Sequence, residues 1–145
     1  MTFLDAARRR DFTINSIGQK IDGEIVDPFG GINDLKNRIL RCTSEAFGED
    51  PLRVLRGFQF AARFELVADE LTLQKCKSLI NEANTLPRER IWSEWEKWAL
   101  KGKKPSLGLK FLVESGWICL YPELANLIYG PDNRMGIPQD PHWHP

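Results

Sequence analysis

Hydrophobic positions in the second half of the chain recur with the period of an α-helix. The clearest run follows Asp50 and Pro51 and contains Leu52, Val54, Leu55, Phe58, Ala61 and Ala62, which predicts a helix over 51–64 with one wide buried face. Pro51 suits the first turn of this helix, and Asp50 suits its N-cap. Similar patterns predict helices over 44–47, 69–83, 87–100, 105–115 and 120–128.

The first 43 residues have a different pattern, which predicts a mixture of short elements. We expect a helix over 5–17, a hairpin over 21–26 around the turn dipeptide Asp22-Gly23, a loop over 27–31, one helical turn over 33–36 and a strand over 39–43. The Asp-Pro-Phe-Gly-Gly loop is expected to be structural. The predicted fold class is therefore α+β, with a short α/β part that gives way to helices near Thr43. So few residues cannot bury a sheet core by themselves, which predicts partner strands upstream of Met1.

Composition restricts the kind of partner. The 145 residues carry 20 basic and 20 acidic side chains, so any nucleic-acid binding must be local, at basic clusters such as 8–10, 36–41 and 101–104. Three widely spaced cysteines favour a reducing compartment over a disulfide framework or a zinc site. No apolar run is long enough to span a membrane and no secretory signal is recognisable. These features predict a cytoplasmic protein.

A polar stripe runs along the predicted helix 51–64, with Asp50, Arg53, Arg56 and Arg63 as its members. Residues three apart on a helix are neighbours, so Asp50 and Arg53 present an acceptor beside a planar donor. That pair is complementary to the amino group and ring nitrogen of cytosine or adenine, and mismatched to guanine and uracil. The alternative is that Asp50 only caps the helix and Arg53 is its ion-pair partner.

Two other motifs carry possible chemistry. In Arg9-Arg10-Asp11, the arginines suit phosphate and the aspartate can accept from a ribose hydroxyl; a solvated basic run is the alternative. In His142-Trp143-His144, the two imidazoles can ligate a metal, but no second cluster of ligands is near, so we expect no metal there.

The order of these motifs is more specific than any one of them. Arg-Arg-Asp-Phe-Thr-Ile-Asn at 9–15, Asp-Pro-Phe-Gly-Gly at 27–31, Glu-Asp-Pro-Leu-Arg-Val-Leu-Arg at 49–56 and Glu-Arg-Ile at 89–91 follow one another. In this order the sequence resembles the bacterial-type (class II) tRNA nucleotidyltransferase and poly(A) polymerase family, most closely its CCA-adding enzymes. The resemblance covers nearly the whole chain.

The resemblance implies a function and a set of roles. Arg10 and Asp11 would contact the ribose. Asp50 and Arg53 would pair with CTP or ATP, Glu49 would position Arg53, and the polar stripe adds Arg56 to the nucleotide site. The implied reaction adds CMP and AMP to the 3′ end of tRNA. The Mg²⁺ ions of that reaction would be held by a carboxylate pair upstream of Met1, so the chain alone is expected to be inactive.

The resemblance also implies a domain organisation. Residues 1–43 would be the distal part of a nucleotidyltransferase head, 44–100 a helical neck that recognises the base, 101–129 the start of a helical body, and 130–145 a linker toward an HD-type domain. Glu89 and Arg90 would brace the neck. Both ends look like positions within a longer protein. A poly(A) polymerase of the same family and a non-catalytic helical tRNA-binding module remain the alternatives.

Overall fold

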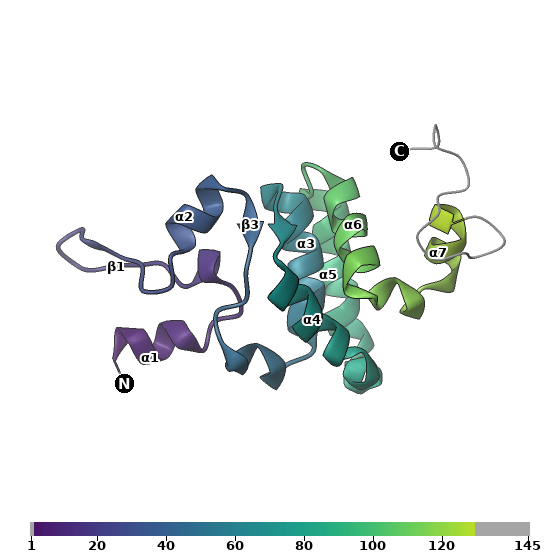
Figure 1. Ribbon diagram of the computed structural model, residues 1–145, viewed down its shortest axis with the longest axis horizontal. Helices are drawn as coiled ribbons and strands as arrows, with labels where there is room; N and C mark the ends of the chain where they lie inside the picture. The colour runs from purple at the N-terminus through teal and green to yellow at the C-terminus, as the bar shows by residue number, and fades with distance from the viewer. Residues whose placement is uncertain (1, 130–145) are drawn as a thin grey trace.

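The computed structural model describes residues 2–129, in which helices dominate (Figure 1). The α-helices are α1 (Phe3–Arg8), α2 (Gly31–Lys36), α3 (Leu52–Phe64), α4 (Glu70–Ser78), α5 (Arg88–Lys101), α6 (Pro105–Ser115) and α7 (Pro122–Tyr129). The strands are β1 (Gly18–Gln19), β2 (Ile25–Val26), β3 (Ile39–Leu40) and β4 (Val67–Ala68), and the 3₁₀ helices are η1 (Thr13–Asn15), η2 (Glu45–Glu49), η3 (Ile80–Thr85) and η4 (Trp117–Leu120). The α+β class is confirmed.

Helix α3 is the centre of the fold. Nine of its thirteen residues are buried, since α5 and α6 cover it on one side and the N-terminal segments on the other. Phe58 packs against Trp95 and Trp98 of α5, with ring centroids 4.6 and 5.3 Å apart. At Gly57 an added Cβ would lie 3.0 Å from the rings of both Phe12 and Phe111. The packing of α3 at this crossing is therefore tight.

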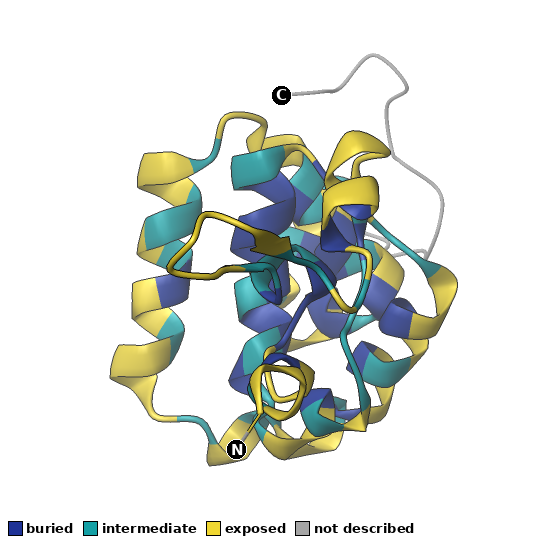
Figure 2. Cartoon of the chain, turned by 90° about the vertical axis from the view of Figure 1, so that its left-hand side faces the viewer, coloured by how far each residue is buried: buried dark blue, intermediate teal, exposed yellow. Residues whose placement is uncertain are grey.

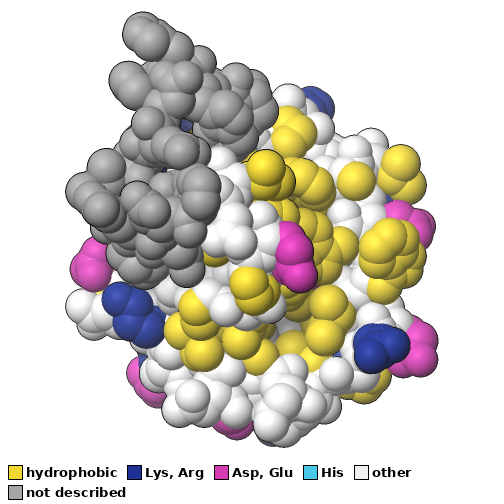
Figure 3. Space-filling model, turned by 90° about the vertical axis from the view of Figure 1, so that its right-hand side faces the viewer, with side chains coloured by type: hydrophobic (Ala, Val, Ile, Leu, Met, Phe, Trp, Pro, Cys, Tyr) yellow, Lys and Arg dark blue, Asp and Glu magenta, His cyan; other side chains and the backbone are white. Residues whose placement is uncertain are grey.

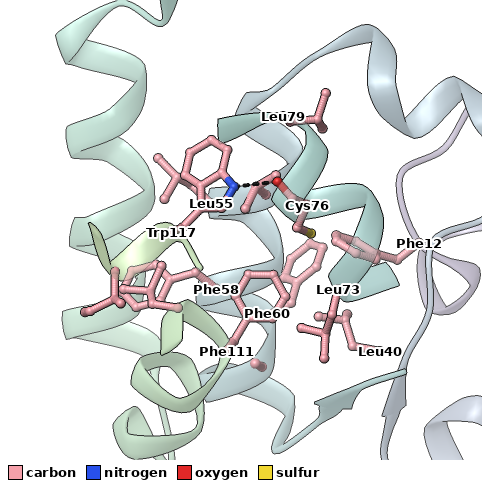
Figure 4. Close-up of a cluster of buried hydrophobic side chains, with 14 of the residues drawn as sticks. Phe12, Leu40, Leu55, Phe58, Phe60, Leu73, Cys76, Leu79, Phe111 and Trp117 are labelled. Atoms are coloured by element: carbon pink, nitrogen blue, oxygen red, sulfur yellow. Dashed lines mark hydrogen bonds between the residues drawn. The ribbon is translucent and has the colours of Figure 1, made fainter. Parts of the chain in front are cut away.

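Aromatic side chains from distant segments complete one continuous core (Figure 4). Phe12 and Leu40 from the N-terminal part are fully buried in it, together with Trp117 from η4. The indole N–H of Trp117 donates to the carbonyl of Cys76 over 2.6 Å, so the buried nitrogen is satisfied. The segments before and after Thr43 thus share a single core.

Two strand pairs connect the short elements. Strands β1 and β2 pair antiparallel around the predicted turn dipeptide, with Gly23 in the left-handed region at φ +94°, but β1 lies before the predicted range of 21–26. Figure 2 shows this hairpin as an exposed projection from a buried interior. Strand β3 pairs in parallel with β4, a two-residue strand too short to be recognised from the sequence.

The predicted helix over 5–17 is wrong. Helix α1 ends at Arg8, residues 10–12 are extended or bent, and only η1 follows. Phe12 is entirely buried and forms an isolated β-bridge with Cys42. Burial of this ring and its backbone pairing outweigh the local helical pattern.

Smaller corrections concern element type and length. The predicted helix over 44–47 is the 3₁₀ helix η2, and the one over 69–83 is α4 followed by η3. Helices α3, α5 and α6 lie where the sequence predicted them. Asp27 does more than form a loop, because its carboxylate accepts from the backbone N–H groups of Gly31 and Ile32 over 2.7 and 2.9 Å and so caps α2.

Apolar side chains also gather on the face that carries η4 and the exposed side of α5 (Figure 3). Trp92 is 67% exposed there, beside a groove of about 500 Å³ that Ile91, Trp95 and Tyr121 also line. Through residues 2–129, no helix combines the length and apolarity needed to cross a membrane.

Candidate nucleotide-binding site

A small polar pocket of about 220 Å³ lies where the start of α3 meets the loop before η1. The residues lining it are Arg9, Arg10, Asp11, Asn15, Asp50, Arg53 and Arg56. Five of the six residues that the sequence analysis placed in a nucleotide site are therefore brought together. The sixth, Glu49, is exposed and lines a neighbouring cavity.

Asp11 is the buried anion of this pocket, with only 4% of its surface exposed. One carboxylate oxygen accepts from the backbone N–H of Phe12 over 3.0 Å and from the side-chain amide of Asn15 over 3.1 Å. The other pairs with the guanidinium of Arg56. A buried carboxylate with three donors is fixed in position, so Asp11 is a rigid acceptor on the pocket wall.

Arg56 is held from two sides. Its Nε bonds Asp11, and its guanidinium carbon lies 5.0 Å from the centroid of the Phe60 ring. Cation–π contact and the charged hydrogen bond favour the same rotamer. Arg56 therefore links the loop before η1 to α3.

Asp50 has two partners. One oxygen accepts from the backbone N–H of Leu52 over 3.1 Å, which is the predicted capping role. The helix itself begins one residue later than predicted, at Leu52. The other bonds Nη2 of Arg90 over 2.8 Å. Burial raises the pKa of Asp50, but the bonds from Arg90 and Leu52 and the nearby charge of Arg53 outweigh it, so the pKa of Asp50 is lowered. The carboxylate is ionised at neutral pH.

Arg53 does not pair with Asp50, so the ion pair considered in the sequence analysis is wrong. Its Nη1 donates to the carbonyl of Ala46 and its Nη2 to the carbonyl of Arg9 over 3.0 Å. Within residues 2–129, the side chain of Glu49 has no hydrogen bond, to Arg53 or to any other group. Two backbone carbonyls hold the guanidinium instead.

A second polar cluster fixes the loop that carries Asp11. The backbone N–H of Thr13 donates to the carbonyl of Arg41 over 2.9 Å, and that of Thr43 to the carbonyl of Asp11 over 3.0 Å. The guanidinium of Arg41 bonds both oxygens of Asp34 over 3.1 and 3.3 Å and one oxygen of Asp69 over 3.1 Å. The sequence does not predict this cluster, because Asp34, Arg41 and Asp69 belong to no recognised motif.

The pocket retains unused hydrogen-bonding capacity. A guanidinium has five N–H donors, and Arg53 uses two of them on carbonyls. The Asp50 carboxylate accepts two bonds of about four that its oxygens can take. An acceptor and a donor thus remain available side by side, although the two residues do not bond one another.

No group of three or more potential metal-ligating side chains occurs in residues 2–129. The described residues therefore do not fit a catalytic metal site. His142 and His144 lie outside the described residues.

The sequence is similar to those of known proteins. Residues 2–41 match the family model described as the poly A polymerase head domain. The whole chain is 45% identical to a Multifunctional CCA protein of Aliivibrio salmonicida, and 94% of it is 46% identical to the Multifunctional CCA protein of Tolumonas auensis. It spans 35% and 33% of the length of these relatives.

Solved structures show the same fold. A CCA-adding enzyme with ATP superposes with a TM-score of 0.71 at 31% identity, over 83% of this chain and 30% of that one. The Thermotoga maritima CCA-adding enzyme complexed with tRNA gives 0.71 at 30% identity, over 84% and 32%. Over its whole length the chain is similar to Multifunctional CCA proteins, and residues 2–41 are similar to the poly A polymerase head domain.

Proposed function

We propose that this chain is the nucleotide-selecting part of a tRNA nucleotidyltransferase that adds CMP and AMP to the tRNA 3′ end from CTP and ATP. The observation that carries the proposal is the pocket of about 220 Å³, in which ribose- and base-directed side chains from two separate motifs meet. The matches to CCA proteins over the whole chain support the same reading.

Base selection is assigned to Asp50 and Arg53. A free lone pair of Asp50 accepts a hydrogen bond from the amino group of cytosine or adenine, and a free N–H of Arg53 donates one to the neighbouring ring nitrogen. Arg90 keeps the carboxylate ionised and oriented through its 2.8 Å bond. Uracil and guanine present a carbonyl and an N–H at these places. The carbonyl would face the Asp50 carboxylate and the N–H would face the Arg53 guanidinium, which costs about 1–3 kcal/mol.

Ribose selection is assigned to Arg10 and Asp11. The Asp11 carboxylate is fixed by Arg56 and Asn15 and keeps a lone pair for a ribose hydroxyl. Arg10 lines the same pocket and is exposed, so it is available to the sugar or its phosphate. Glu49 acts at the rim of the site, outside the pocket itself.

The remaining parts of the proposal concern the longer protein. Residues 1–43 are the distal head, 44–100 the neck, 101–129 the start of the body, and 130–145 a linker. Mg²⁺ would be held by residues that precede Met1. A cytoplasmic location is supported by three cysteines that are all unbridged. A poly(A)-adding activity remains the second candidate, because the head-domain match is to a poly A polymerase model.

The test is calorimetric titration of the chain with the four ribonucleoside triphosphates. CTP and ATP are expected to bind more tightly than UTP and GTP, and Arg53→Ala is expected to abolish that difference. Arg63→Ala is the matched control, because Arg63 lies on the same helix but outside the pocket. Equal affinity of the unmodified chain for all four nucleotides would contradict the proposal.

A further inference from the structure

Two basic clusters that lie far apart in the sequence meet at the C-terminal end of α3. Arg38 reaches this end from the segment before β3, and its Nη1 donates to the carbonyl of Phe64 over 3.0 Å. Lys103 and Lys104 reach it from the loop between α5 and α6, and their backbone N–H groups both donate to the carbonyl of Ala62 over 3.0 Å. The last carbonyls of α3 therefore hold both clusters in place, and no role proposed above uses them.

The charge at this end of α3 is strongly positive. The segments that meet there, 36–39, 62–68 and 98–106, contain six cationic side chains and one carboxylate. The cationic residues are Lys36, Arg38, Arg63, Lys101, Lys103 and Lys104, and the carboxylate is Glu65. Across residues 2–129, none of these seven side chains forms an ion pair. Asp69 and Glu70, the next acidic residues along the chain, would still leave six cations against three carboxylates.

The two lysines of the loop have side chains that are free to bind a ligand. Lys103 and Lys104 are exposed, and in the part of the chain that the structure describes only their backbone groups are bonded. The loop backbone itself is closely packed, because a Cβ added at Gly102 would lie 2.5 Å from the carbonyl oxygen of Trp98. A fixed backbone thus presents two ammonium groups at the surface.

The cluster lies at the opposite end of α3 from the nucleotide pocket. Asp50 and Arg53 line that pocket at the start of the helix. Because α3 has 13 residues, roughly 20 Å separate its two ends. A nucleotide in the pocket therefore leaves the cluster free, whereas an RNA whose 3′ end lies at the pocket extends far enough to reach it.

We propose that this cluster binds backbone phosphates of the base-paired stem next to the tRNA 3′ end, with Arg38, Lys103 and Lys104 as the phosphate ligands. The inference rests on the proposed function, which places the 3′ end at the nucleotide pocket. A local excess of lysine and arginine is the electrostatic signature of nucleic-acid binding. Since the chain as a whole has a net charge of zero, this local excess orients the RNA on the surface. Phosphate contacts of this kind fix position without reading sequence.

The experiment measures the affinity of the chain for a fluorescein-labelled tRNA minihelix, which has a base-paired stem and a single-stranded 3′ end, by anisotropy over a series of salt concentrations. Loss of one phosphate contact to a duplex lowers the slope of log K against log salt by about 0.9, which is about eightfold in affinity near 0.1 M salt. Lys103→Gln and Lys104→Gln are each expected to show this loss. Lys104→Arg, which keeps the charge, is expected to stay within about twofold.

Lys77→Gln is the charge-matched control, because Lys77 is exposed and lies beside Gly116, at the other end of α6 from Lys104. The assignment is overturned if the unmodified chain does not bind the minihelix, if both test variants keep its slope, or if Lys77→Gln loses as much. A loss of thermal stability without a loss of RNA affinity would also overturn it, because the lysines would then only balance the partial negative charge at the end of α3.

A second probe, a single-stranded oligonucleotide of the 3′ end alone, locates the phosphates. An eightfold loss with this probe as well would move them from the stem to the 3′ end and overturn the assignment. If the unmodified chain shows no nucleotide preference but the test variants still weaken the minihelix, the proposed function fails and the RNA surface stands. If the nucleotide preference is present and the slope is unchanged, only the RNA surface fails.

Discussion

Replacing Asp50 with alanine separates two roles that this carboxylate combines. Its structural role is to accept from the N–H of Leu52 and to pair with Arg90. Loss of a capping acceptor costs about 1 kcal/mol. The ion pair adds about 0.2–1 kcal/mol, because the Arg90 side chain is 49% exposed and solvent screens the pair. Asp50→Ala should therefore lower the free energy of unfolding by about 1–2 kcal/mol.

The proposed recognition role predicts a second effect that capping does not. Without the carboxylate, the amino group of cytosine or adenine loses its acceptor, and roughly 1–3 kcal/mol of discrimination disappears. The ratio of the Kd for UTP to the Kd for CTP should then fall about 5- to 150-fold. Titration calorimetry with all four nucleotides and thermal melting, both on the same preparation, measure the two effects separately.

Arg90→Ala is the informative comparison. It breaks only the ion pair and leaves the carboxylate at the pocket, so it should cost no more than about 1 kcal/mol of stability. Its nucleotide preference should fall less than that of Asp50→Ala. The reasoning is refuted if both variants melt at a lower temperature while Asp50→Ala keeps an undiminished preference for CTP and ATP. Asp50 would then be a cap and an ion-pair partner only.

Three further predictions concern the whole chain. Incubation with CTP, ATP, Mg²⁺ and tRNA that lacks its 3′ end should give no extension on a sequencing gel, because residues 2–129 hold no cluster of metal ligands; extension by clean protein would contradict this. Gly57→Ala should lower stability in urea by at most about 2 kcal/mol, because overpacking of the new methyl group against Phe12 and Phe111 costs about 1–3 kcal/mol and the higher helix propensity of alanine returns about 1 kcal/mol; a raised midpoint would show that the crossing is loose. The pKa of Asp50 is lowered on folding, so its ionised form stabilises the fold above its ordinary pKa of 3.8, and this contribution is lost as the pH falls through the lower folded-state value. The stability difference between the unmodified chain and Asp50→Asn should therefore be largest near neutral pH and shrink below pH 3.8, and a difference that grew in acid would reverse the sign of the argument.

The sequence predicts the helices well where one periodic face is buried. The positions of α3, α5 and α6 follow from apolar spacing and from Pro51, Pro87 and Pro105 in or beside their first turns. The same reasoning fails near Phe12, whose local pattern is helical. That side chain reaches a core formed by residues far along the chain, and pairing with Cys42 sets its backbone. Contacts between distant segments leave no local pattern to detect.

The candidate site shows a similar division. The motifs and the polar stripe predict that Arg10, Asp11 and Arg56 belong to one site, and the fold brings them together. The partners were harder to predict. Asp50 and Arg53 are neighbours on the helix, yet each bonds a group from another segment. The spacing of residues on a helix predicts which side chains lie close together. The hydrogen-bond partner that each side chain takes depends on the tertiary structure.

The parallel pairing of β3 with β4 has a mechanical consequence. The N–H of Val67 donates to the carbonyl of Arg38 over 2.9 Å, and that of Asp69 to the carbonyl of Leu40 over 3.1 Å, so the chain leaves the first 43 residues, runs through α3 and returns to pair with them. Bending at Thr43 would have to break this pairing and open the shared core. The two walls of the nucleotide pocket therefore move as one body. A change of preferred nucleotide during a reaction would have to come from rotating side chains such as Arg53, or from segments beyond these residues, and not from a hinge at the boundary.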